Sequence, residues 1–358
     1  MRLAVAHEWL VERAGSEKTF EAMAKAFPDA DLFALTREPS AAFDFGDRPV
    51  RTTILDRSAF LRRRRDLTLP LMPLAWALLR PKEHYDRVLT SSHACVKAFP
   101  PAHHSEHFCY VHAPMRYAWD RANDARASSR GRFADMALEA MRRWDSRSSA
   151  SVDHFAANST AVRDRVRRAY GRRARIIFPP VDTEFFTIDS HERPREHALA
   201  VSRFIPYKRI DLAIDACARA GMPLTIAGSG PQEPALRRRA RHAGVPVSFE
   251  VSPSDERLRD LYRSAAVLLF PAEEDFGIVA VEAQACGTPV IAIDQGGARD
   301  TVIDGVTGVL VGRQDADLLA DALRTVHASK MDPRACRSNA ERFSSLRFQS
   351  EIRSWLGA

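Results

Sequence analysis

The segment FPAEEDFGIVAVEAQACGTPVIAI, residues 270–293, is the most informative part of this chain about its fold. It begins at the end of an apolar run, Val267 to Phe270, and closes on another, Pro289 to Ile293, and both runs are typical of buried strands. Between them the residues from Gly277 to Cys286 predict a helix. A strand, a helix and a strand in so short a segment predict a parallel α/β unit, in which ligands bind at the carboxyl ends of strands and at helix N-termini.

Two carboxylates flank the start of the predicted helix. Glu274 lies just before it and Glu282 lies inside it, and the helical rise separates them by roughly 12 Å, the reach from one sugar to another across a diphosphate. The free amides near Gly277 and the positive end of the helix dipole suit a phosphate. Glu274 would then accept hydrogen bonds from a transferred hexose, and Glu282 from a nucleotide ribose. The alternative is a solvated Glu282 and a Glu274 that caps the helix.

This segment resembles the donor-binding motif of glycosyltransferase family 4, whose members are retaining enzymes with the two-domain GT-B fold. The family pattern is a Glu, seven residues and a second Glu, with Phe-Gly after the first Glu and Gly-x-Pro-Val after the helix, and it is matched without a gap. The resemblance extends along nearly the whole chain and is greatest to the mannosyltransferase branch of O-antigen and capsule assembly. It implies an α/β fold of two Rossmann-like domains with an interdomain cleft, and further donor contacts from Phe276, Gly277 and Ile278.

The composition fits a globular protein of two domains. A chain of 358 residues is long enough for two cores, and 45% hydrophobic with 28% charged residues is an ordinary globular composition. The five cysteines are scattered and form no CxxC pair, which argues for reduced thiols and against a disulfide framework or a zinc site. The chain begins MRLAVAHEWL, too short an apolar run for a signal peptide, and no apolar run approaches a membrane span. We therefore expect a cytoplasmic protein.

The net charge of +7 comes from clustered basic residues. They are not interleaved with aromatic residues or joined to a recognition motif, so no nucleic-acid partner is expected. Arg237 to Arg241 are typical of a solvated helix face. Arg62 to Arg65 differ, because Phe60 and Leu61 precede them and LPLMPLAWALL follows them, and basic charge beside apolar bulk suits anionic lipid. Peripheral contact with the inner face of the cell membrane is one hypothesis, and burial of the apolar part in the core is the other.

The domain boundaries follow from the alternation of apolar and polar segments. A first domain is expected over 1–186, a polar, proline-bearing linker over 187–197 and a second domain over 198–342. The family resemblance implies that a last helix, within 343–358, crosses back to the first domain. The expected strands are Leu3 to Ala6, Arg87 to Thr90, Phe108 to Val111, His154 to Ala157, Arg175 to Phe178, Ala198 to Ser202, Leu224 to Ala227, Val247 to Val251, Val267 to Phe270, Val290 to Ile293 and Gly308 to Val311.

More donor chemistry is expected in the second domain. The segment VSRFIPYKR places Arg203 and Lys208 at the end of its first strand, and the resemblance implies that both neutralise the donor diphosphate. Fixed cations of this kind stabilise the charge that develops on a leaving nucleoside diphosphate. A salt bridge at a helix start is the alternative. Gly228 opens a tight turn on the nucleotide side, and Val251-Ser252-Pro253 replaces a turn that often contains Gly in the family, which leaves guanine or uracil open.

The first domain contains the segment YVHAPMRYAWD, which follows an expected strand. Its resemblance to the family implies that His112 lies beside the donor sugar; a structural histidine is the alternative. The acceptor side would be formed by Arg116, Tyr117 and Trp119. Gly15 corresponds to the family's glycine-rich loop near the diphosphate, although family members often have two glycines there.

We expect no cofactor and no metal, because Arg203, Lys208 and the helix amides supply the positive charge. Two Asp-Ala-Asp triplets, Asp29 to Asp31 and Asp315 to Asp317, lie away from the donor motif. The resemblance implies front-face attack by an acceptor hydroxyl, with the departing phosphate taking the proton. GDP-mannose is the first choice of donor, and a lipid-linked or growing surface glycan is the expected acceptor. The alternatives are a UDP-sugar transferase, a phosphorylase or epimerase on the same scaffold, and a non-catalytic basic protein that binds membrane or nucleic acid.

Overall fold

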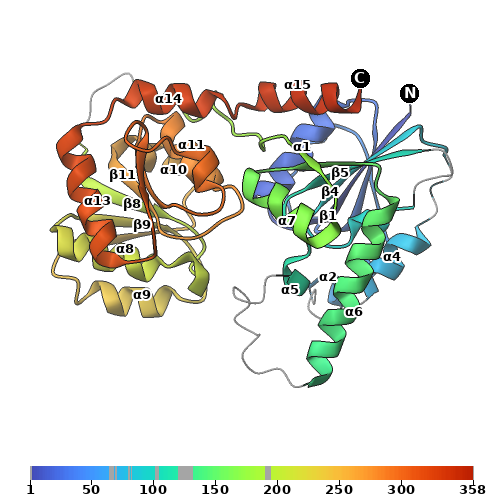
Figure 1. The fold of residues 1–358 in the computed structure, drawn as a ribbon, viewed down its shortest axis with the longest axis horizontal. Coiled ribbons are helices and arrows are strands. Elements are labelled where there is room, and N and C mark those ends of the chain that lie inside the picture. Colours follow the sequence, from blue (N-terminus) through green and yellow to red (C-terminus); the bar gives the residue numbers. More distant parts are fainter. Residues whose placement is uncertain are drawn as a thin grey trace. The chain divides into compact units, whose positions relative to one another are not determined.

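The computed structural model describes residues 2–63, 68, 71–79, 81, 83–100, 105–119, 132–189 and 195–357. The chain forms two compact units, one of Met1–Pro180 with Leu346–Ala358 and the other of Val181–Ser345. Each unit is built on one parallel sheet (Figure 1). The second unit thus begins before the expected linker at 187–197, of which residues 190–194 lie outside the described residues.

The sheet of the first unit has the order β3-β2-β1-β4-β5-β6-β7. All eight residues of β1 are buried, as expected for a central strand with helices on both faces. The strand order reverses between β1 and β4, so the carboxyl ends of these two strands mark the topological switch point where such sheets bind ligands. The strands are β1 (Leu3–Leu10), β2 (Asp31–Arg37), β3 (Val50–Thr52), β4 (Arg87–Ser92), β5 (Glu106–Val111), β6 (His154–Ala157) and β7 (Ala174–Ile176).

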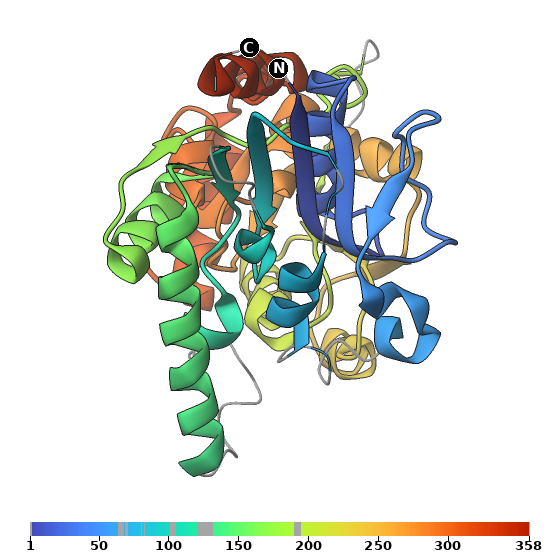
Figure 2. The same ribbon diagram turned by 90° about the vertical axis from the view of Figure 1, so that its right-hand side faces the viewer.

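Helices cover both faces of this first sheet. One face packs on α1 and the last helix, α15, through a core that contains Phe20, Phe348 and Ile352. The other face packs on α4 through Trp76 and Phe99. Figure 2 shows α6 extending beyond the edge of the sheet. The helices are α1 (Gly15–Ala26), α2 (Ala59–Arg63), α4 (Met72–Leu78), α5 (Arg116–Trp119), α6 (Arg132–Ser148), α7 (Thr160–Tyr170) and α15 (Ser345–Leu356).

The sheet of the second unit has the order β10-β9-β8-β11-β12-β13, which reverses between β8 and β11. Its strands are β8 (His197–Val201), β9 (Leu224–Gly228), β10 (Val247–Val251), β11 (Ala265–Phe270), β12 (Val290–Ile293) and β13 (Gly308–Val311). Its helices are α8 (Ile210–Ala220), α9 (Glu233–Ala240), α10 (Asp255–Ser264), α11 (Ile278–Ala285), α12 (Ala298–Thr301), α13 (Ala316–Ser329) and α14 (Pro333–Glu341). The β11–α11–β12 unit contains the stretch of residues 270–293.

The α/β class with two parallel sheets agrees with the sequence, but two strands were missed. β2 contains the third residue of an Asp-Ala-Asp triplet, Asp31, whose Oδ2 accepts a hydrogen bond from the Tyr85 hydroxyl at 2.7 Å. In the other triplet, Asp315 caps α13 by accepting from the amide of Asp317 at 2.9 Å. Both triplets therefore stabilise local structure. Among the described residues no helix is long and apolar enough to cross a membrane.

Candidate active site

The loop between β11 and α11 is shaped by glycine. Gly277 caps α11 with φ of 90°, a backbone conformation that favours glycine. A Cβ atom at this position would lie 2.9 Å from the ring of Phe270, the last residue of β11. The helix can start this close to the strand end only because residue 277 has no side chain. Its first amides are therefore held at the carboxyl edge of the sheet, at the switch point.

Lys208 and Glu274, both expected in the donor site, form an ion pair with each other. The Lys208 ammonium donates to Glu274 Oε1, and the two side chains are only 10% and 21% exposed. Lys208 ends a short 3-10 helix, Pro206–Lys208, which follows β8, whereas Glu274 follows β11. The two strands that flank the switch point thus supply one charge each. Lys208 thus forms a salt bridge, as the alternative interpretation expected. Its partner, however, is Glu274, which is itself a candidate donor-binding residue.

Glu282 is buried rather than solvated. Its exposure is 5%, and its Oε2 accepts a hydrogen bond from the Tyr262 hydroxyl at 2.9 Å. Tyr262 lies in α10 and is completely buried. Burial raises the pKa of Tyr262 well above its usual value, and the charge of Glu282 adds to the effect. Tyr262 therefore remains a neutral donor that orients the Glu282 carboxylate, which excludes the solvated-helix alternative.

Arg203 is positioned by a close approach of two strand ends. A Cβ atom on Gly228 would lie 1.9 Å from the Ser202 carbonyl oxygen, and Gly228 has φ of +136°. The amide of Phe204 donates to the Ser229 carbonyl at 2.8 Å. The loop after β8 is thereby clamped against the end of β9. Arg203 itself is exposed, and its Nη2 lies 3.4 Å from the Tyr207 hydroxyl.

Two glycines that the sequence analysis did not select hold the Glu274 loop from the other side. The amide of Gly297, after β12, donates to the Glu274 carbonyl at 2.8 Å. Cβ atoms on Gly296 and Gly297 would lie 2.2 Å from the Glu274 carbonyl oxygen and 2.3 Å from Phe276 Cα. Phe276 is buried, with its ring 5.5 Å from that of Phe343. A Gly-Gly pair two residues beyond the end of an expected strand was the signal in the sequence.

The first unit places His112 and Gly15 at the carboxyl edge of its own sheet. His112 follows β5 and is 9% exposed, and its amide donates to the Ser92 carbonyl at 2.8 Å. Its Nε2 lies 2.8 Å from Ser91 Oγ in β4. Gly15 is the first residue of α1, which follows β1. Gly15 therefore follows one of the two strands at the switch point, β1, and His112 contacts the other, β4, through Ser91.

The short helix α5 carries the residues expected on the acceptor side. The Trp119 indole N–H donates to Asp145 Oδ2 at 2.8 Å, and the Tyr170 hydroxyl donates to the same atom at 2.8 Å. Asp145 is fully buried and pairs with the buried Lys97 at 2.8 Å. The polar edge of Trp119 therefore anchors α5 within the unit. The side chains of Arg116 and Tyr117 lie outside the described residues, so their roles stay predictions.

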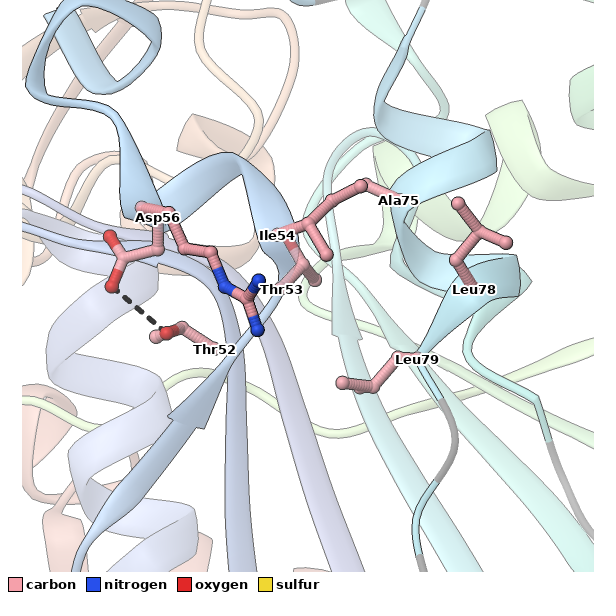
Figure 3. A pocket seen from close by; sticks show the side chains of 8 residues that line it. Thr52, Thr53, Ile54, Asp56, Ala75, Leu78 and Leu79 are labelled. Atoms are coloured by element: carbon pink, nitrogen blue, oxygen red, sulfur yellow. Dashed lines mark hydrogen bonds between the residues drawn. The ribbon is translucent and has the colours of Figure 1, made fainter.

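The expected basic patch is described only in part. Arg64 and Arg65 lie outside the described residues, and the Arg62 guanidinium donates to the Asp56 carbonyl oxygen. A cavity of about 260 Å³ lies nearby, between the 3-10 helix Ile54–Arg57 and α4. Figure 3 shows its apolar wall and the hydrogen bond from Thr52 to Asp56. The lining residues are Thr52, Thr53, Ile54, Asp56, Arg57, Ala75, Leu78 and Leu79, none of which is a candidate site residue.

Two family models match the chain, one after the other. Glycosyltransferase Family 4 matches residues 14–185, and Glycosyl transferases group 1 matches residues 182–343. The chain belongs to the glycosyltransferases with these two domains. The second match contains the Lys208–Glu274 pair and Glu282, and the first contains Gly15 and His112.

The curated relatives that match this glycosyltransferase include D-inositol 3-phosphate glycosyltransferases. That of Nocardiopsis dassonvillei is 35% identical over 218 residues, which cover 52% of this chain and 51% of the relative. That of Mycolicibacterium smegmatis is 37% identical over 169 residues, which cover 42% and 39%. The chain thus spans about half the length of the curated relatives it matches. These names do not support the expected mannosyltransferase branch.

Solved structures confirm the GT-B fold. Anabaena Alr3699/HepE, in complex with UDP and glucose, has a TM-score of 0.74 at 18% identity, with 99% of both chains covered. A sucrose-phosphate synthase from Thermosynechococcus elongatus has a TM-score of 0.77 at 21% identity, with 99% of this chain and 98% of that chain covered. At these identities the likeness establishes the fold alone.

Proposed function

We propose that this protein is a retaining, metal-independent glycosyltransferase that moves a hexose from a nucleotide sugar to an acceptor hydroxyl. The observation that carries the proposal is the partly buried Lys208–Glu274 pair, at the carboxyl edge of the second sheet and beside the start of α11. A cation, a carboxylate and helix amides at one switch point suit the diphosphate and the sugar of a donor. Family membership supports the reaction class.

In the proposed mechanism the cations act on the leaving group. The bond between the anomeric carbon and the diphosphate oxygen breaks, the acceptor oxygen bonds to the same face of the sugar, and a phosphate oxygen takes the acceptor proton. Negative charge grows on the diphosphate during this step, and Lys208, Arg203 and the amides after Gly277 stabilise it. Glu274 accepts hydrogen bonds from hexose hydroxyls and keeps Lys208 in place. His112 acts at the donor sugar.

Glu282 is proposed to bind the ribose of the nucleotide. A carboxylate accepts several hydrogen bonds, and the Tyr262 hydroxyl donates one of them to Glu282 Oε2 at 2.9 Å. Because the neutral Tyr262 holds the carboxylate in one orientation, the carboxylate is preorganised for a ribose hydroxyl. Phe276 and Ile278 are proposed to line the same side of the donor, next to Gly277. Gly228, at the end of β9, is proposed on the nucleotide side, and Gly15 of the first unit near the diphosphate.

GDP-mannose remains the proposed donor, on the resemblance to the mannosyltransferase branch. The alternative is a UDP-sugar, which the UDP in the Anabaena Alr3699/HepE structure supports. Thermal shift measurements with GDP, UDP and their sugar conjugates separate the two, because tight binding to the folded state raises the melting temperature. A larger shift with UDP than with GDP would replace the GDP-mannose assignment.

A lipid-linked or growing surface glycan is the proposed acceptor, reached by peripheral contact with the inner membrane face. Several large apolar side chains around α2 and α4 are exposed, and two of them, Ile54 and Leu78, line the cavity of Figure 3. They are Ile54 at 50%, Phe60 at 60%, Leu71 at 46%, Leu74 at 56% and Leu78 at 49%. Co-sedimentation with anionic vesicles, and its loss in a Phe60→Ser/Leu74→Ser variant, tests this contact.

The reaction itself is tested by the release of nucleoside diphosphate. Release should depend on both the nucleotide sugar and an added glycan acceptor, and Glu274→Gln should abolish it while nucleoside diphosphate still binds. Product linkage analysis should show the α configuration of the donor retained. Release that needs no acceptor, or an inverted product, would contradict the proposed function.

A further inference from the structure

Three histidines of the first unit surround one serine. His7 lies in β1, His93 follows β4 and His112 follows β5, and the register of β1 and β4 places His7 opposite Ser91. The ring centroids are 5.6 Å apart for His7 and His93, and 6.2 Å apart for each of the other two pairs. Within the part of the chain that the structure describes, no such group is arranged to hold a metal ion. The hydrogen bonds of the cluster therefore decide its role.

The first hydrogen bond fixes the proton of His7. Its Nδ1 lies 3.2 Å from the Ser91 carbonyl oxygen and 3.0 Å from Ser91 Oγ. A carbonyl oxygen only accepts, so His7 Nδ1 carries a hydrogen and shares it between the two oxygens. Burial lowers the pKa of His7 to about 3, with a further contribution from His112, so that His7 is neutral near pH 7. Its single ring proton is then the one on Nδ1.

The second hydrogen bond, from Ser91 to His112, has its donor and acceptor fixed by the first. Ser91 Oγ accepts from His7, and its own proton is left to donate. The acceptor is His112 Nε2, at 2.8 Å. Ser91 is completely buried, so its hydroxyl proton has no solvent partner. A nitrogen that accepts carries no proton, so the hydrogen bond from Ser91 to Nε2 places the ring proton of His112 on Nδ1.

We propose that Ser91 and His7 are positioning residues for His112. The hydrogen bonds from His7 through Ser91 hold the His112 ring and select its Nδ1–H tautomer, so that His112 meets an oxygen of the donor sugar as a hydrogen-bond donor. This inference rests on the proposed transferase function for the substrate, but the hydrogen-bond order is a property of the protein alone. In histidines generally, the hydrogen bond made by one ring nitrogen determines whether the other nitrogen carries the proton.

Nitrogen NMR of the full chain labelled with ¹⁵N-histidine tests the tautomer directly. His112→Gln identifies the His112 signals by their loss. The expected result is an Nδ1–H pattern for His112 in the wild type and a shift towards Nε2–H in Ser91→Ala. An Nε2–H or doubly protonated His112 in the wild type, or an unchanged pattern in Ser91→Ala, would overturn the proposal.

Variants at His7 provide matched controls. The amide of His7→Asn can donate from nearly the position of Nδ1, whereas His7→Leu cannot donate at all. His7→Asn should keep the Nδ1–H pattern of His112, and His7→Leu should weaken it. Equal effects of both substitutions, with both proteins folded by circular dichroism, would show that His7 acts by packing alone.

The kinetic consequence separates positioning from general damage. Ser91→Ala should lower kcat by about 10–100-fold, the range found when a group that orients another is removed. The Kd for nucleoside diphosphate should stay unchanged, and His7→Asn should retain most of the turnover. A weaker Kd with unchanged kcat would refute the role assigned to Ser91. The NMR measurement requires no turnover. An inactive wild type would therefore contradict the proposed function, whereas the hydrogen-bond order would still be tested by the NMR pattern.

Discussion

Replacing Lys208 with methionine removes an ammonium but keeps most of the volume of the side chain. Two separate effects should follow. The ion pair with Glu274 is lost, and because the two side chains are only 10% and 21% exposed, the free energy of unfolding should fall by about 1–3 kcal/mol. The ammonium that stabilises negative charge on the departing diphosphate is also lost, so kcat should fall by roughly 10²–10³. Donor affinity should fall much less, because the diphosphate carries more negative charge in the transition state than in the bound donor.

The assay measures acceptor-dependent release of nucleoside diphosphate at saturating donor, beside urea unfolding of the same variants. Arg237→Met is the matched control. It removes a cation of the same unit that lies on α9 and pairs with Glu233 at 2.9 Å, and kcat should not change. A double variant, Lys208→Met with Glu274→Gln, loses the contribution of the ion pair only once. Comparing its free energy of unfolding with those of the two single variants therefore isolates that contribution. Equal losses in donor affinity and in kcat for Lys208→Met would refute the transition-state role.

Four further outcomes are expected. Glu282→Gln should weaken nucleoside diphosphate binding by about 1–3 kcal/mol in calorimetry, and an unchanged Kd would remove Glu282 from the ribose. Gly297→Ala should destabilise the protein by about 1–3 kcal/mol or more because its Cβ would meet Phe276 Cα at 2.3 Å, whereas Gly312→Ala, which meets nothing within 4 Å, should cost less. Similar denaturation midpoints for the two variants would contradict the close packing. Turnover should persist in EDTA, and its loss with recovery on adding manganese would refute the metal-free mechanism. Stability should fall as the pH drops from about 6.5 towards 4, because burial lowers the pKa of His107 to about 4 and only the unfolded chain then takes up the proton; urea titrations of His107→Gln should show a shallower pH dependence.

The sequence predicted the elements whose pattern is local. Continuous apolar runs identified β11 and β12, because strands buried on both faces lack polar alternation. β3, over Val50–Thr52, contains too few residues to form a pattern and was missed. β2 was missed although five of its residues are buried. It closely follows a helix, and it begins at the last residue of an Asp-Ala-Asp triplet that was considered only as a metal motif.

The candidate site was predicted as a set of residues but not as a set of contacts. Spacing placed Glu274 and Glu282 around a helix start, yet it could not show that Tyr262 in α10 would hold Glu282. The bond from Ser91 to His112 likewise depends on the register of β4 and β5, which no local pattern encodes. Contacts between strand ends are set by the tertiary fold. A single sequence can therefore indicate which side chains belong to the site, but not which residues they contact.

The Glu274 loop shows why these partners matter for function. Its backbone is held by the amide of Gly297, its side chain by Lys208 and its exit into α11 by the missing side chain of Gly277. These constraints come from the carboxyl ends of β12, β8 and β11, three strands that are neighbours around the switch point. A loop fixed from three strand ends loses little entropy when a ligand binds, and electrostatic groups held in advance stabilise a transition state without reorganising. The rigidity of the sheet edge, and not the helix dipole by itself, is therefore what prepares this carboxylate and this ammonium for transfer.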